Sequence, residues 1–165
     1  LRKLSFKIIH STTILLPAWK SILKTLELPP RIMPWNVLTR WNLTFDMLNF
    51  ALQYQKAIDA ITDKHKLGLG EYSLEDDDWM LAKQLRDVLK DATLYFSRGT
   101  PNLAMVIPAM DHIDTMFTNG IVQNKHFNPA IRTALGLAKC TLNRYYSCTD
   151  SSVVYRIAMG RCFII

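Results

Sequence analysis

The sequence has few residues of the kinds that build disulfide-rich, zinc-binding or membrane-spanning proteins. Its three cysteines, Cys140, Cys148 and Cys162, are an odd number without a Cys-x-x-Cys pair. They therefore predict neither a disulfide framework nor a structural zinc site, and they fit a reducing compartment. The two longest uncharged stretches, residues 8–19 and 99–110, have only twelve residues each and contain proline. A membrane-spanning helix needs about 20 apolar residues, so we expect none.

The sequence also lacks a recognisable set of catalytic residues. His10, His65 and His126 are isolated from one another, no Ser–His–Asp or Cys–His set follows from spacing, and there is no glycine-rich phosphate loop. Asp111 and Asp114 are three residues apart and share a helix face, but a metal or acid–base role needs further ligands that the sequence does not nominate. We therefore expect no catalytic residues, no metal and no cofactor.

Acidic residues are nearly absent from the first quarter of the chain. Residues 1–40 contain one acid, Glu27, and seven basic residues, which are Arg2, Lys3, Lys7, Lys20, Lys24, Arg31 and Arg40. The remaining residues hold thirteen bases and thirteen acids, so the net charge of +6 comes from this quarter. Such a distribution suggests a contact with a polyanion. A solvated helix face explains the same charges equally well.

Strand-like alternation is missing as well, and apolar residues recur at helical spacing throughout. We therefore predict an all-α fold, a bundle of five or six helices. The first helix covers the N-terminal residues and is kinked or split by Pro17 near residues 11–16. Pro29 and Pro30 end it, and residues 29–38 form an extended connector. The second helix is predicted over residues 42–63.

Capping signals place the remaining helices. Ser73 is expected to open and cap the third helix, followed by four acids at residues 75–78 that suit the positive end of the helix dipole. Thr100-Pro101 predicts another start, Asn119-Gly120 a stop, and Asn128-Pro129 a further start. Asp150 is expected to cap a short last helix through residue 155. Cys140 is expected to be a small apolar residue near the core.

One short run combines the side chains that bind nucleic acid. Arg40, Trp41 and Asn42 stand at the end of the basic quarter, immediately before a predicted helix. A tryptophan can stack on an exposed base while a neighbouring guanidinium binds phosphate. Alternatively, Trp41 staples the start of the helix through Phe45.

Several runs resemble the hAT family of DNA transposases, particularly its fungal members. They are TRWN at residues 39–42, DML at 46–48, AIDA at 57–60, LAKQL at 81–85, FSR at 96–98, PNLA at 101–104 and IPAMDHI at 107–113. Together the similarity extends over residues 1–159. In that family an RNase H-like core carries three metal-binding acids, and a large helical insertion separates the last acid from the first two.

The resemblance implies that the chain is a fragment of such a transposase. Residues 1–38 would be a basic helical connector leading out of the core, 39–159 part of the helical insertion domain, and 160–165 a divergent tail. The catalytic acids are not among these residues, so the fragment would not be an enzyme by itself, since phosphodiester cleavage by this route needs acids that clamp two metal ions. The implied setting is the nucleus, with transposon-end DNA as partner and a homo-oligomeric full-length protein.

Within this interpretation we expect the DNA contacts to come from Arg40, Trp41, Asn42, Arg31, Lys3 and Lys7. The resemblance places Arg40 and Trp41 near the transposon end. Two alternatives stay open: a helical protein-interaction module, and a remnant of a transposable element without function.

Overall fold

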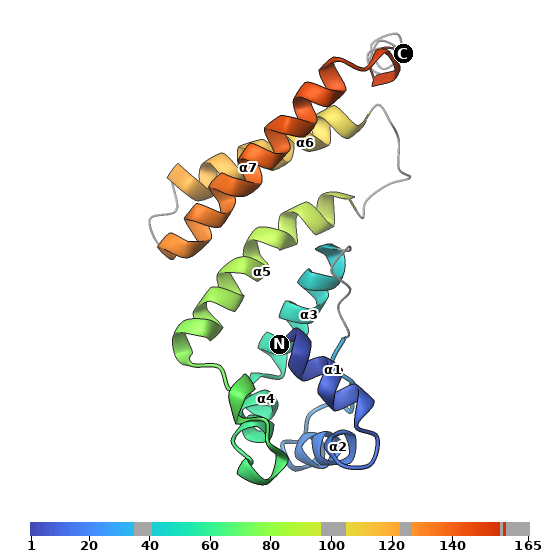
Figure 1. Cartoon of the computed structure of the whole chain (residues 1–165), viewed down its shortest axis with the longest axis vertical. Coiled ribbons are helices and arrows are strands. Elements are labelled where there is room, and N and C mark those ends of the chain that lie inside the picture. The colour runs from blue at the N-terminus through green and yellow to red at the C-terminus, as the bar shows by residue number, and fades with distance from the viewer. Residues whose placement is uncertain (35–40, 97–104, 123–126, 156, 158–165) are drawn as a thin grey trace. The chain divides into compact units, whose positions relative to one another are not determined.

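The computed structural model describes residues 1–34, 41–96, 105–122, 127–155 and 157, and all regular structure in these ranges is helical (Figure 1). The described residues form seven α-helices whose bounds follow, two short 3-10 helices, η1 (His65–Leu67) and η2 (Gly70–Tyr72), and a short helical segment at residues 153–155. The all-α prediction is confirmed. There are more helices than the five or six expected, because two of the predicted helices are each divided in two.

The N-terminal helix is divided where Pro17 indicated. Helix α1 spans Arg2–His10 and α2 spans Leu15–Thr25. In the turn between them, the amide of Leu15 donates to the Ser11 hydroxyl at 3.2 Å. Pro17 thereby falls in the first turn of α2, where its missing N–H would have no intrahelical partner anyway. Helix α2 ends four residues before Pro29, and Glu27 beyond it adopts a left-handed φ of 53°.

The helix predicted over residues 42–63 is interrupted at Tyr54, which separates α3 (Trp41–Gln53) from α4 (Gln55–Thr62). The Tyr54 ring stacks on Phe50 with centroids 4.2 Å apart, and its hydroxyl donates to the carbonyl of Pro29 at 3.1 Å. The apolar stripe continues across the break, so periodicity carries no sign of it. At the break, the Tyr54 side chain contacts residues outside its own helix turn.

The chain forms two compact units, Leu1–Leu89 and Lys90–Ile165. In the first unit, α1 packs on α2, and α2 packs on α4. The core between them is centred on Trp19, which is completely buried, and its largest fully buried neighbours are Leu4, Ile8, Leu23, Met33, Ile58, Ile61 and Leu69. This set comes from α1, α2, α4 and the segments that join the helices.

The connector after α2 is held to this core by side-chain hydrogen bonds. The indole Nε1 of Trp19 donates to the carbonyl of Arg31 at 2.9 Å. The Ser5 hydroxyl donates to the carbonyl of Pro34 at 3.0 Å, and Ser5 is itself fully buried. Residues 28–34 contain three prolines and have no ladder or helix to satisfy their carbonyls, so these side chains supply the partners.

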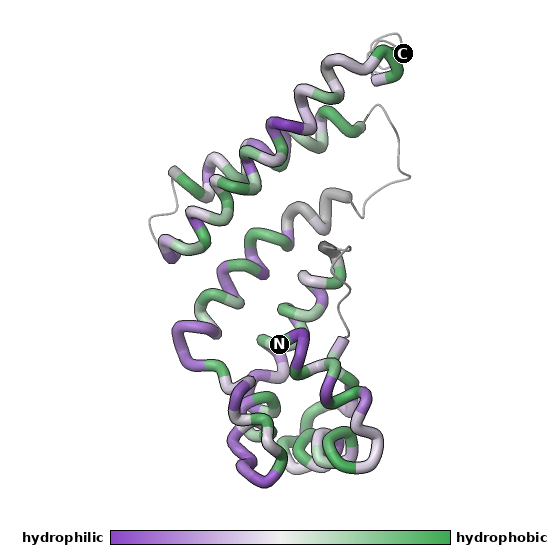
Figure 2. Tube along the Cα trace, viewed as in Figure 1, coloured by the Kyte–Doolittle hydropathy of each residue, from purple (hydrophilic) through white to green (hydrophobic). Residues whose placement is uncertain are grey.

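The third predicted helix is α5 (Asp76–Phe96), and its cap is not the one expected. Ser73 lies outside the helix with an extended ψ of 141°, at the end of η2. Glu75 occupies the N-cap position, since its carbonyl accepts the first helical bond, from Trp79. Asp78 folds back and accepts from the Glu75 amide at 3.2 Å, the second half of a capping box. The hydrophilic start of α5 is visible in Figure 2.

In the second unit, α6 (Val106–Val122) and α7 (Pro129–Asp150) pack against each other. The start predicted at Asn128-Pro129 is confirmed, because the Asn128 side chain accepts from the Ala130 amide at 2.9 Å. The stop predicted at Asn119-Gly120 is wrong, since α6 continues through both. A Cβ at Gly120 would lie 2.8 Å from Leu135 Cδ1, so this glycine permits close helix packing.

Two further expectations are decided by the structure. Cys140 is exposed, contrary to the core position expected, because it lies on the side of α7 away from the buried Ile131 and Leu135. The short last helix expected through residue 155 is present at residues 153–155, but Asp150 does not precede it as a cap, because Asp150 is the last residue of α7. The start signal at residues 100–101 lies outside the described ranges. The division at residue 38 stays a prediction about the larger protein, whereas the compact units divide after Leu89.

None of the helices in the described part of the chain combines the length and apolar character needed to cross a membrane.

Candidate nucleic-acid interface

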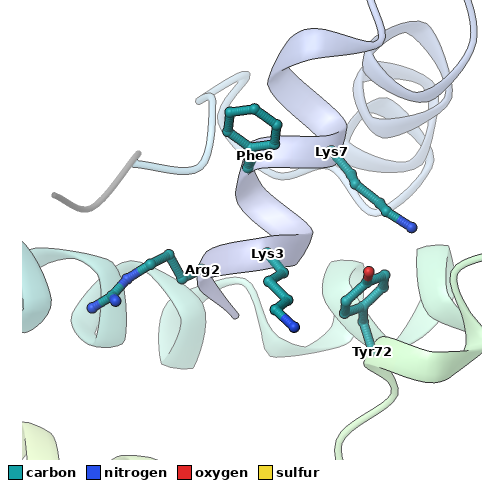
Figure 3. Close-up of a pocket in the computed structure, with 5 residues that line it drawn as sticks. All are labelled: Arg2, Lys3, Phe6, Lys7 and Tyr72. Carbon is teal, nitrogen blue, oxygen red and sulfur yellow. The ribbon is translucent and has the colours of Figure 1, made fainter. Parts of the chain in front are cut away.

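Two of the residues predicted to contact DNA lie on one solvent-facing side of α1. Lys3 and Lys7 are four residues apart, which brings their side chains to the same face of the helix. The helix is held in place by Leu4, Ser5 and Ile8, which point away from the lysines by different angles and are completely buried. Figure 3 shows both lysines extending from α1 toward Tyr72, with Arg2 pointing away from them.

Arg31 is exposed but is not part of this face. Its segment is tied to α1 through Ser5, whose hydroxyl bonds the carbonyl of Pro34. At about 100° per residue, Ser5 points about 160° away from both Lys3 and Lys7. The connector therefore packs on the other side of α1, and the structure does not join Arg31 to the two lysines in one patch.

The remaining predicted contacts are not placed in detail. Arg40 lies outside the described residues. Trp41 and Asn42 are the first two residues of α3, and their side chains lie outside the description. The choice between base stacking and helix stapling by Trp41 therefore stays a prediction.

A pocket of about 410 Å³ lies beside the two lysines, and it is lined by Arg2, Lys3, Phe6, Lys7 and Tyr72. One of the lysines that line it, Lys7, is paired with the carboxylate of Glu71. Lys7 Nζ lies 3.0 Å from Glu71 Oε1 and 4.8 Å from the centre of the Tyr72 ring. Interaction with the Tyr72 hydroxyl, and next with Glu71, raises the pKa of Lys7. Contacts with Tyr72 and Lys7 lower the pKa of Glu71. Both groups are thus charged at neutral pH and pair with each other, and Arg2 and Lys3 add two further positive charges to the pocket lining.

An aromatic pair borders the lysines on the same helix. The rings of Phe6 and His10 stack with centroids 3.9 Å apart and an interplanar angle of 27°. Both residues are exposed, and Phe6 keeps 46% of its surface in solvent. Sequence reasoning treated the positions as unremarkable. The i, i+4 spacing of the two aromatics could have revealed the pair, but nothing local indicates that Tyr72 lies beside α1.

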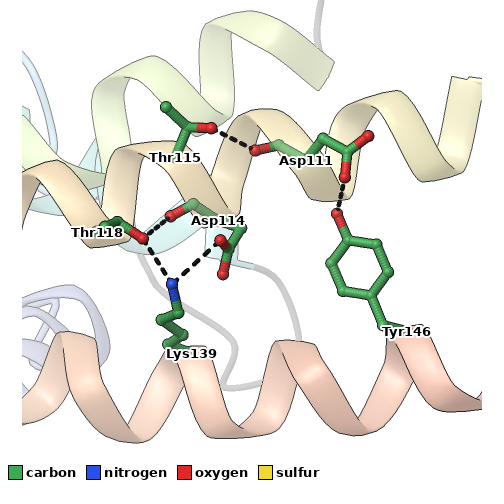
Figure 4. A network of polar contacts seen from close by, with 6 residues as sticks. All are labelled: Asp111, Asp114, Thr115, Thr118, Lys139 and Tyr146. Carbon is green, nitrogen blue, oxygen red and sulfur yellow. Dashed lines mark hydrogen bonds and ion pairs between the residues drawn. The ribbon is translucent and has the colours of Figure 1, made fainter.

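The two aspartates considered as metal ligands are engaged in joining α6 to α7 (Figure 4). Lys139 Nζ lies 3.1 Å from Asp114 Oδ2 and donates to the Thr118 hydroxyl at 2.6 Å. The Tyr146 hydroxyl donates to Asp111 Oδ1. The pairing order, with earlier residues of α6 facing later residues of α7, makes the two helices antiparallel. These acids therefore act as structural contacts between helices.

The described residues include no group of three or more histidine, cysteine or acidic side chains arranged to hold a metal ion. The solvent face of α1 carries cationic and aromatic side chains. This combination suits the binding of an anion that also has a planar group. Comparisons with family models, curated proteins and solved structures find no match for this chain. The likeness to hAT transposases therefore rests on the short sequence runs alone.

Proposed function

We propose that this chain is a DNA-binding and scaffolding fragment of an hAT-like transposase, catalytically incomplete by itself. The observation that carries the proposal is the cationic first quarter of the chain, which ends in the run TRWN at residues 39–42. The basic side chains described there are largely in solvent: Lys3, Lys7, Lys20, Lys24 and Arg31 are all exposed. The helical architecture is compatible with an insertion domain of that family.

Binding would occur mainly through phosphates. Lysine and arginine side chains that neutralise phosphates release condensed counterions, so the affinity falls with salt by a logarithmic slope of about −0.9 per contact. Four such contacts would lower the affinity roughly 100-fold between about 50 and 200 mM salt. Lys7 would contribute less than the others, because Glu71 already pairs with it.

Fluorescence anisotropy with a labelled DNA duplex tests this proposal. The double variant Lys3→Gln/Arg31→Gln should weaken binding at low salt and reduce the magnitude of the salt slope by about 2. The control is Lys83→Gln/Lys90→Gln, which removes the same charge from exposed positions on α5, outside the basic quarter. Binding that is independent of salt, or equally weakened by both double variants, would overturn the proposal.

A second candidate, a helical protein-interaction module, is favoured by a separate observation. Large apolar side chains are exposed along the C-terminal part of the description: Leu137, Tyr145, Val153, Val154 and Ile157 each keep more than half of their surface in solvent. Such side chains are enriched at protein contacts when they form a patch. A chain that binds no DNA at low salt would favour this candidate over the first.

A further inference from the structure

The solvent face of α1 combines charges and rings within a narrow sector. Lys3, Phe6, Lys7 and His10 follow one another at spacings of three, one and three residues. At about 100° per residue, these four side chains lie within a sector of about 100°. Tyr72 adds a third aromatic ring from the far end of the same unit's sequence, and it lines the pocket together with Phe6 and both lysines (Figure 3).

The two aromatic rings on this face hold each other in a fixed orientation, as a surface for base stacking needs. Phe6 and His10 already stack on each other, and the His10 Nδ1 lies 2.9 Å from the carbonyl of Phe6. This contact limits the rotamers of His10 and so reduces the entropy lost on binding. Nearly half of the Phe6 surface faces solvent.

Charge complementarity decides which ligand such a face fits. Three cations and, among the described residues, no acid line the pocket, and Glu71, which lies beside it, is engaged by Lys7. The excess positive charge beside aromatic rings suits a ligand with a phosphate next to a flat, exposed ring. An unpaired nucleotide has both, whereas the bases of a duplex are stacked on one another and present no open face. We infer that the α1 face formed by Lys3, Phe6, Lys7 and His10, with Tyr72, binds an unpaired nucleotide of single-stranded DNA.

This inference rests on the proposed function, because it specifies the form of DNA that the basic quarter recognises. It differs from the proposed function in assigning the stacking to Phe6 on α1, 33 residues before the first residue of the TRWN run, Thr39. The phosphate contact falls to Lys3, and base stacking falls to the Phe6 ring.

The test measures binding of the full chain to two labelled probes, single-stranded oligothymidylate and a duplex of equal length. Phe6→Leu removes the aromatic face and keeps most of the apolar volume. It should weaken binding to the single strand at least 5-fold, in the range of about 5- to 100-fold seen when a stacked aromatic is lost, and change duplex binding less than 2-fold. Phe6→Tyr restores a ring and should restore single-strand binding.

The matched control is Tyr145→Leu, which removes an exposed aromatic ring from α7 in the other unit and should affect neither probe. Circular dichroism of each variant checks that α1 remains folded, and the Tyr variant keeps the test decisive if Phe6→Leu loses helix. Equal losses on both probes, or no loss, would overturn this inference and leave the proposed function standing. Failure of the unaltered chain to bind either probe would overturn the proposed function. Phe6-dependent binding of an acidic peptide, without Phe6-dependent binding of the oligothymidylate, would assign the face to a protein partner instead.

Discussion

Replacing Trp19 is the most informative perturbation of the first unit. This side chain is completely buried, and it lies near Phe50 and Tyr54, with ring centroids 6.4 Å from each. Its indole also donates to the Arg31 carbonyl at 2.9 Å and so anchors the connector after α2. Packing of three helices and the path of a proline-rich segment therefore depend on one residue.

The expected cost can be estimated from these contacts. Trp19→Phe removes the hydrogen bond, a loss of about 1 kcal/mol, and the outer part of the ring system, another loss of about 1 kcal/mol. Trp19→Ala removes almost the whole side chain from a closed core and should cost about 3–5 kcal/mol. For a unit of this size, each kcal/mol lowers the melting temperature by about 4–8 °C. We therefore expect Trp19→Phe to melt roughly 10 °C lower.

Tryptophan emission during urea and thermal unfolding measures this effect in the first unit alone, because all four tryptophans fall within residues 1–89. Trp79, which is buried and bonded to Asp59, still reports on this unit in the Trp19 variants. The control is Met80→Ala, which shortens an exposed apolar side chain on α5 and should change stability by less than about 0.5 kcal/mol.

The outcome that refutes this reasoning is a small effect of both substitutions. If Trp19→Phe and Trp19→Ala each lowered the free energy of unfolding by less than about 1 kcal/mol, Trp19 would not be the centre of a packed core. If Trp19→Ala were strongly destabilising and Trp19→Phe were not, the packing role of Trp19 would stand. The indole hydrogen bond would then contribute nothing to stability.

The other predictions concern the start of α5 and a carboxylate beside it. Asp78→Ala should lower the free energy of unfolding by about 0.5–1 kcal/mol through loss of the contact with the Glu75 amide, whereas Ser73→Ala should change it little; urea titrations of the two variants compare them, and the reverse order would restore Ser73 as the cap. Burial, and secondarily the charges of Asp63 and neighbouring Asp76, raise the pKa of Asp59, while a hydrogen bond from Trp79 opposes the shift. Because the pKa of Asp59 is raised in the folded state, its charged form lowers the free energy of unfolding. This destabilisation is absent below the ordinary aspartate pKa and complete above the raised folded-state pKa. Asp59→Asn should therefore be slightly more stable than the unaltered chain at pH 7, by less than about 1 kcal/mol, and this gain should shrink as the pH falls to the ordinary aspartate range; a gain that does not change with pH would contradict the assignment.

Local signals in the sequence determined the helical class and several helix boundaries. The apolar periodicity, the break near Pro17 and the start at Asn128-Pro129 depend on residues close to each other in the chain, so their physics is readable without a structure. The charge of the first forty residues is likewise a property of the sequence, and it suggested a polyanion as partner without any structure.

Contacts between distant residues decided the rest. Tyr54 interrupts a continuous apolar stripe while its side chain contacts Phe50 and Pro29, and Gly120 lies within a helix because α7 approaches closely at Leu135. A local pattern cannot distinguish a glycine that ends a helix from one that admits a neighbour. The pocket on α1 arises in the same way, since residues at the start of the chain meet Glu71 and Tyr72 through the packing of α1 on α2, of α2 on α4 and of α4 on η2.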